Sequence, residues 1–144
     1  MEPKIRVGVV GVGHLGKEHA RIYSQLSECQ LVGISDRDPA KADKARELGT
    51  AYYRDYKDLL GKVDAVSIAT PTSTHYTVAR EFLEKGVHVL VEKPITLRLR
   101  EADELIRISR KRRCTLQVGH IERHNPAFKQ VREIAKKIRF LEIH

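Results

Sequence analysis

The segment Gly11-Val12-Gly13-His14-Leu15-Gly16 decides how this chain of 144 residues folds. A mostly apolar run, residues 5–10, comes directly before it, and a helical pattern of apolar residues follows it. A second apolar run, residues 30–35, then leads into Asp36, which lies 20 residues after Gly16. Glycines placed between a strand pattern and a helix pattern predict a tight turn that brings the helix back against the strand.

The spacing of these glycines predicts a cradle for a dinucleotide. Gly11 allows the tight turn, Gly13 lets the backbone approach a pyrophosphate, and Gly16 lets the helix pack closely against the strand. The backbone amides near His14 and Leu15 then point at the phosphates from the start of the helix. A glycine turn without a ligand is the alternative, and the strands, the helix and the downstream acidic residue argue against it.

The residues after the second apolar run bear on the choice of cofactor. Asp36 is placed to accept hydrogen bonds from the hydroxyl groups of the adenosine ribose. Its negative charge repels a ribose 2′-phosphate, so we expect NAD in preference to NADP. Arg37 stands beside it, and for this residue stacking on the adenine and binding of the 2′-phosphate both stay open.

Strand and helix patterns alternate along the chain. Short runs rich in Val and Ile cover residues 5–10, 30–35, 51–53, 64–69, 87–91 and 115–118. Helices between them have recognisable ends, because Asp38-Pro39 and Asn125-Pro126 each open one and Gly49 follows another. Ser73 or Thr74 is expected to open the helix after the fourth strand. The alternation predicts an α/β fold with a doubly wound parallel sheet.

The last eight residues, 137–144, do not fit the same domain. Their sequence KIRFLEIH alternates charged and apolar side chains and predicts one more strand. We therefore expect a dinucleotide-binding domain over residues 1–136, and at 137–144 the first strand of a C-terminal domain that is otherwise absent. An apolar edge strand without a partner sheet favours pairing with a second copy, which predicts a homo-oligomer.

The distribution of charge bears on possible partners. The chain holds 27 Lys and Arg against 19 Asp and Glu, and residues 93–144 account for the excess with 14 against 6. The densest run, Arg110-Lys111-Arg112-Arg113, suits the negative end of a helix dipole. Because no aromatic residue interleaves this run to stack on bases, we expect no nucleic-acid partner.

Other function classes are excluded by what the sequence does not contain. No apolar run reaches the roughly 20 residues of a membrane span, and the first residues show no signal-peptide pattern. Cys29 and Cys114 are too far apart to indicate a metal or redox pair. We therefore expect a reduced, cytoplasmic protein without a membrane partner.

A polar stretch, Thr70-Pro71-Thr72-Ser73-Thr74-His75, follows the fourth predicted strand. Ligands of open α/β sheets bind beyond the carboxyl ends of the strands, so we expect Thr70, Pro71 and His75 to contact the cofactor. Capping of the next helix by hydroxyl side chains such as Ser73 is the alternative.

A charged turn, Glu92-Lys93-Pro94, follows the fifth predicted strand. Lys93 is expected at the same edge of the sheet, where it can donate a hydrogen bond or a proton to a substrate hydroxyl group. Pro94 fixes the turn, and a cis peptide bond is one way of doing so. A lysine that is simply solvated is the alternative.

A fourth polar stretch, GHIERHNP at residues 119–126, follows the sixth predicted strand. His120, Arg123 and Asn125 supply hydrogen-bond donors and a cation that suit a hydroxylated or phosphorylated ligand. A polar loop that opens a helix at Asn125-Pro126 is the alternative. His120 and His124 have no Cys or carboxylate set to complete a metal site, so none is expected.

Together these motifs resemble one protein family. The order and spacing of GVGHLG, Asp36, ATPTSTH, EKP and GHIERHNPA are similar to those of the Gfo/Idh/MocA oxidoreductases. The resemblance covers essentially the whole chain, and its last motif is most similar to the branch of UDP-N-acetylglucosamine 3-dehydrogenases. It implies a Rossmann domain of an NAD(P)-dependent dehydrogenase that acts on a sugar or nucleotide-sugar.

The resemblance also implies roles for individual residues. Lys93 corresponds to the active-site lysine of the family, and Glu92 and Pro94 set its position beside the cofactor. His120, Arg123 and Asn125 would lie near the nicotinamide and the substrate. The family's usual histidine base belongs to a C-terminal domain, so we expect residues 1–144 alone to be poorly active. A non-catalytic dinucleotide-binding module is the alternative function.

Overall fold

The computed structural model describes residues 3–134, and its frame is one six-stranded sheet. The strands are β1 (Ile5–Val10), β2 (Cys29–Ser35), β3 (Ala51–Tyr53), β4 (Ala65–Ile68), β5 (His88–Val91) and β6 (Leu116–Val118). All neighbouring strands are parallel, in the order β3-β2-β1-β4-β5-β6. The direction of winding reverses between β1 and β4, which confirms the predicted doubly wound sheet.

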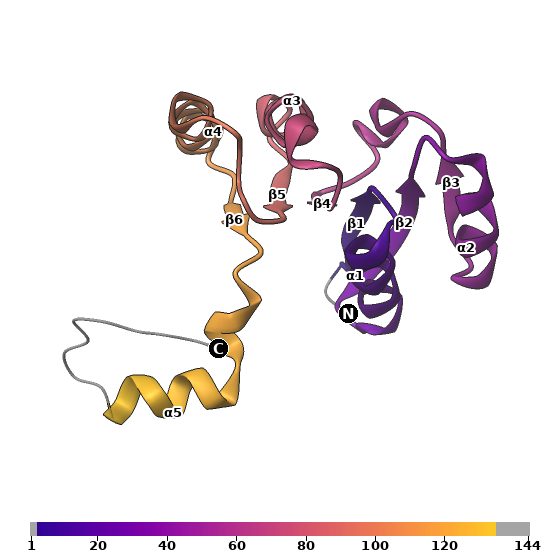
Figure 1. The fold of residues 1–144 in the computed structure, drawn as a ribbon. Helices are drawn as coiled ribbons and strands as arrows, with labels where there is room; N and C mark the ends of the chain where they lie inside the picture. Colours follow the sequence, from indigo (N-terminus) through magenta and orange to yellow (C-terminus); the bar gives the residue numbers. More distant parts are fainter. Residues whose placement is uncertain (1–2, 135–144) are drawn as a thin grey trace.

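The helices are α1 (His14–Gln25), α2 (Ala42–Glu47), α3 (Thr72–Glu84), α4 (Leu99–Arg112) and α5 (Pro126–Ile134), with short 3₁₀ turns η1 (Pro39–Lys41), η2 (Tyr56–Leu59) and η3 (Ile121–His124). Helices α1 to α4 connect strands of the sheet and cover it, whereas α5 follows the last strand. Figure 1 shows α3 and α4 side by side over β4, β5 and β6, whereas η3 and α5 extend away from the sheet. Within the described residues, no helix is both long and apolar enough to cross a membrane.

Two apolar cores lie on the two faces of the sheet. Consecutive strand residues point to opposite faces, so Val9 joins the core with Ala20 of α1 while Val10 joins the core with Phe82 of α3. Val9, Ala20 and Phe82 have no exposed surface. Burial on both faces explains why the strand sequences are nearly continuous in hydrophobicity.

Most of the predicted helix ends are confirmed. The side chain of Asp38 accepts a hydrogen bond from the backbone N–H of Ala40 at 3.0 Å, and Asn125 does the same for Ala127 at 3.0 Å. The basic run ends α4 as expected, with Arg113 in the left-handed region at φ 56°.

The predicted start of α3 is wrong by one or two residues. The helix begins at Thr72 rather than at Ser73 or Thr74. Pro71 precedes it with φ −56°, a value that the proline ring imposes, and its carbonyl accepts from the N–H of Thr74 at 2.9 Å. No side chain of the described residues caps this end. The segment 137–144, with its predicted strand and pairing, lies outside the described residues.

We expect Gly16→Ala to destabilise the fold strongly while Gly13→Ala does not. A Cβ atom at Gly16 would lie 1.8 Å from the carbonyl oxygen of Gly11, whereas one at Gly13 would meet nothing within 4 Å. Gly16→Ala should lower the free energy of unfolding by at least about 3 kcal/mol, and Gly13→Ala by less than about 1 kcal/mol. Urea unfolding of both variants measures this, and equal losses would contradict the packing described.

Candidate functional site

A cleft of about 890 Å³ opens at the carboxyl ends of β1, β2 and β4. The sequence-predicted residues that line it are Gly11, Gly13, Asp36, Arg37, Thr70 and Pro71. They come from three separate loops, which the parallel sheet brings to one edge at the point where its winding reverses. The structure therefore gathers six of the twelve predicted cofactor residues in one cleft.

The three glycines of the first loop have different surroundings. Gly11 has φ +83°, and a Cβ atom there would lie 2.8 Å from the backbone of Ala69. Gly16 is more crowded still, against the carbonyl of Gly11, whereas Gly13 faces open space. Gly11 and Gly16 thus let the turn and α1 pack, while Gly13 leaves room for a ligand to approach the backbone.

The start of α1 is suited to an anion. Gly13 is its N-cap, and among the described residues no side chain accepts a hydrogen bond from the first turn. His14 and Leu15 are exposed there, so the backbone N–H groups of this turn are open to a ligand. A phosphate is the group that such a helix end binds best.

The carboxylate of Asp36 is held in place by backbone groups. Its Oδ2 accepts from the N–H of Val12 at 2.8 Å, and its Oδ1 accepts from the N–H of Asp38 at 3.0 Å. A carboxylate has about four acceptor positions, so two remain for the hydroxyl groups of a ribose. This contact with the glycine loop is not visible in the sequence pattern.

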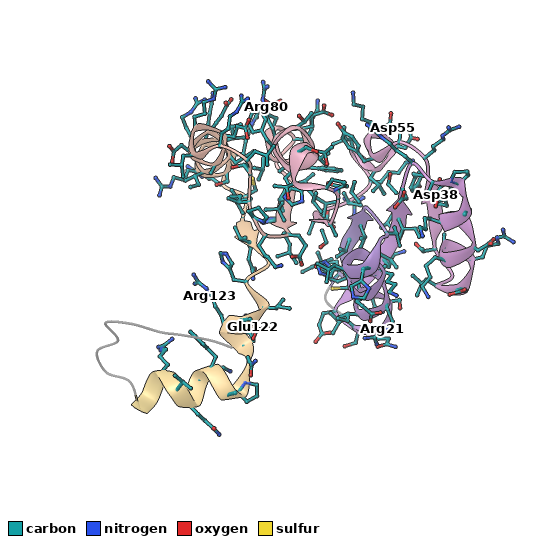
Figure 2. All side chains as sticks on the ribbon, in the orientation of Figure 1. Arg21, Asp38, Asp55, Arg80, Glu122 and Arg123 are labelled. Atoms are coloured by element: carbon teal, nitrogen blue, oxygen red, sulfur yellow. The ribbon has the colours of Figure 1, made fainter. Side chains whose placement is uncertain are left out.

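The cleft also contains residues that the sequence analysis missed. Arg54, Tyr56 and Lys57 line it from the segment after β3. Figure 2 shows Asp55, from the same segment, near the end of the sheet at which Asp38 lies. Burial and the neighbouring Glu81 raise the pKa of Tyr56 to about 12, so its hydroxyl group stays a hydrogen-bond donor. A search of the residue positions just after β3 would have found this group.

The turn after β5 places Lys93 beside a second cavity. Glu92 is buried, with 5% of its surface exposed, whereas Lys93 is exposed and precedes Pro94 through a cis peptide bond. Lys93 lines a cavity of about 480 Å³ together with His120 and Arg123. The structure thus brings the predicted lysine and two of the three predicted substrate residues together.

The third predicted substrate residue has a local role in the structure. The side chain of Asn125 donates to Glu122 at 2.8 Å and accepts from the N–H of Ala127 at 3.0 Å. It does not line the cavity beside Lys93, whereas Arg123, shown with Glu122 on the stretch after β6, does (Figure 2). Contact of Asn125 with a substrate stays a prediction.

His75 is almost completely buried, with 1% of its surface exposed. Its Nε2 lies 2.8 Å from the carbonyl oxygen of Thr70, and its Nδ1 lies 2.9 Å from that of Pro94. The ring therefore connects the loop after β4 with the turn after β5. Direct contact of its side chain with a cofactor stays a prediction.

Other charged groups lie apart from the two cavities. None of Arg110, Lys111, Arg112 and Arg113 lines either one. In residues 3–134, no group of three or more His, Cys, Asp or Glu side chains is arranged to hold a metal ion.

Known proteins are similar to this chain in sequence and fold. A curated relative, the UDP-N-acetylglucosamine 3-dehydrogenase of Acidithiobacillus ferrooxidans, is 46% identical over 130 residues, which are 90% of this chain and 41% of the relative. A solved structure of that enzyme superposes with a TM-score of 0.84, at 44% identity over 92% of this chain and 43% of the other. The structure of GenD2 from gentamicin A biosynthesis, in complex with NAD, has a TM-score of 0.89 at 30% identity over 94% of this chain and 40% of the other.

The family model of an oxidoreductase family with an NAD-binding Rossmann fold matches residues 5–120. This span runs from the first residue of β1 to the loop after β6 and includes the glycine loop, Asp36 and Lys93. The chain covers about two fifths of the length of the relatives it matches. The chain belongs to the Gfo/Idh/MocA oxidoreductase family and forms its NAD-binding Rossmann domain.

Proposed function

We propose that this chain is the cofactor-binding part of a dehydrogenase that oxidises a hydroxyl group of a sugar or nucleotide-sugar with NAD. One observation carries the proposal. The imidazole of His75 is within 2.9 Å of both Thr70, which lines the larger cleft, and Pro94, which follows Lys93. The dinucleotide cradle and the lysine therefore lie on neighbouring loops of one sheet edge, as hydride transfer next to a substrate oxygen requires.

The residues of the cleft fit a dinucleotide. The open backbone at Gly13 and the first turn of α1 suit a pyrophosphate, and Asp36 is held with two acceptor positions free for a ribose. Thr70 and Pro71 border the side toward Lys93. When bound, the nicotinamide accepts the hydride from the substrate carbon.

Lys93 is the residue that we expect to contact the reacting hydroxyl group of the substrate. Its ammonium group has donors only, so it can hold the oxygen of the reacting hydroxyl group and stabilise negative charge on it. His120 and Arg123 line the same cavity and can orient the remaining hydroxyl or phosphate groups of the substrate. The base that takes the hydroxyl proton is expected, from the family resemblance, in the part of the relatives that this chain does not match.

Asp36 favours NAD over NADP. Its carboxylate repels a 2′-phosphate, although Arg37, Arg54 and Lys57 line the same cleft and carry positive charge. We propose that the carboxylate of Asp36, rather than these basic side chains, determines the preference for NAD, because a backbone hydrogen bond holds it at the glycine loop.

We expect NADH to bind at least about tenfold more tightly than NADPH, because a ribose bond to a carboxylate is charge-assisted. Asp36→Ala should weaken NADH binding by roughly 10- to 100-fold. Titration calorimetry with both dinucleotides measures these ratios, and Asp103→Ala, an exposed position on α4, is the control. Equal or tighter binding of NADPH by the natural chain would contradict this, and would show that Arg37, Arg54 and Lys57 determine which dinucleotide is preferred.

Lys93 can be tested in a chimera that supplies the remaining domain. The part of this chain that aligns with the A. ferrooxidans enzyme, 130 residues long, would replace the matching part of that enzyme. We expect the chimera to reduce NAD with UDP-N-acetylglucosamine and the isolated chain to do so poorly. Lys93→Met should lower kcat by about 10²-fold or more and leave NADH affinity unchanged.

Lys111→Met, at the end of α4, is the matched control because it removes an ammonium group away from both cavities. Turnover by Lys93→Met at the rate of its parent would refute the role of Lys93. A chimera that binds NADH and turns over no sugar nucleotide or cyclitol would favour a non-catalytic binding module.

A further inference from the structure

Two histidines from two different helices hold the turn that carries Lys93. His19 lies on α1, which follows the glycine loop, and His75 lies on α3, which follows the Thr70 loop. Each is within hydrogen-bond or ion-pair distance of the turn: His19 at Glu92 and His75 at Pro94. Both helices begin at the cofactor cleft, so each histidine links a cofactor-binding loop to the lysine.

His19 approaches the turn through a buried carboxylate. Its Nε2 is 3.2 Å from Oε1 of Glu92, and its Nδ1 is 2.6 Å from Oγ of Ser67 on β4. Only 7% of the Glu92 side chain is exposed, and His19 is the only basic side chain that the structure, over residues 3–134, places within 4.0 Å of that carboxylate. A buried carboxylate without such a partner is costly, so His19 determines where this one lies.

The carboxylate in turn contacts the backbone on both sides of the substrate cavity. Oε2 of Glu92 accepts from the N–H of Lys93 at 3.2 Å. A Cβ atom at Gly119 would lie 2.9 Å from Oε1, so the loop after β6 passes directly against the carboxylate. Lys93 and Gly119 both line the smaller cavity. The position of Glu92 therefore sets two walls of that cavity.

His75 holds the other end of the turn through two backbone contacts. Carbonyl oxygens only accept hydrogen bonds, so the ring donates to one of them from the nitrogen that carries a proton, and the tautomer decides which one. The ring has nitrogen atoms on two sides, one against each carbonyl oxygen, whereas an amide side chain has only one nitrogen. Replacing His75 by Asn or Gln therefore keeps one contact at most, whereas Gln at position 19 can still donate to Glu92.

We propose that His19 and His75 are positioning residues that fix the Glu92-Lys93-Pro94 turn to the two cofactor-binding loops. The proposal rests on the role proposed for Lys93 and deepens it. Because His19 contacts the carboxylate of Glu92 and His75 contacts the carbonyl oxygen of Pro94, removing either ring should loosen the turn locally. The amide of Lys93, which donates to Glu92, reports on this loosening directly.

The test is residue-resolved amide hydrogen exchange of the whole chain with NADH bound. His19→Asn, His75→Gln and His75→Asn should speed exchange at the Lys93 amide by roughly tenfold, since a lost hydrogen bond has about this effect on local opening. His19→Gln should stay within about threefold of the natural chain. Exchange in β1 should be unchanged in all variants that keep their unfolding midpoint.

His88→Gln is the control. That histidine accepts from the N–H of Thr115 at 3.0 Å, at the opposite end of β5 from Glu92. It should leave exchange at Lys93 unchanged, although it also removes a ring that binds the backbone.

The proposal is overturned if His19→Asn and His19→Gln give the same exchange at Lys93, or if exchange rises equally in β1. It is also overturned if folded His75 variants leave the Lys93 amide as slow as before. Should the buried His75 variants fail to fold, the two His19 variants alone decide. Amide exchange is measured without turnover. Its outcome therefore tests the two histidines separately from the role of Lys93, which is tested by the effect of Lys93→Met on kcat.

Discussion

The contact between Gly16 and the carbonyl group of Gly11 is the constraint on which the rest of the structure depends. No side chain fits between them, because a Cβ atom at Gly16 would be 1.8 Å from that oxygen. This close contact holds α1 against the end of β1. The first turn of α1 therefore faces the cleft, which lies where the winding of the sheet reverses. The same placement brings His19, one turn further along, to Ser67 and Glu92. A single close packing contact therefore orients both the phosphate cradle and the support of the lysine turn.

The fold was largely predictable because parallel strands buried on both faces need nearly continuous apolar sequence. Asp38-Pro39 and Asn125-Pro126 marked helix starts correctly, since their side chains accept backbone hydrogen bonds that no other local group satisfies. The start of α3 was predicted one or two residues too late because several neighbouring hydroxyl residues could each cap a helix, whereas the helix begins directly after Pro71, whose carbonyl accepts from the N–H of Thr74. Local signals are reliable only where one residue provides the decisive interaction.

The site was predictable to the extent that topology alone creates it. Gly13, Asp36 and Thr70 converge because the carboxyl ends of parallel strands meet at one edge. The pairing of His19 with Glu92 was not predictable, because the two residues are far apart in sequence and each is unremarkable by itself. The buried position of His75 was not predictable either, because a histidine in a polar stretch of sequence is typical of a ligand-binding group. Only the packed structure shows that both of its ring nitrogens face carbonyl oxygens.

Binding of a nicotinamide dinucleotide in the cleft at the carboxyl ends of β1, β2 and β4 would bring its reactive end toward the lysine turn. Amide hydrogen exchange of the natural chain, compared with and without saturating NADH, tests it most directly. We expect slower exchange at residues 12–16, at Asp36 and Arg37, and at the loops that carry Thr70 and Lys93, with α4 unchanged. Protection confined to the basic end of α4, or no protection at saturation, would contradict it.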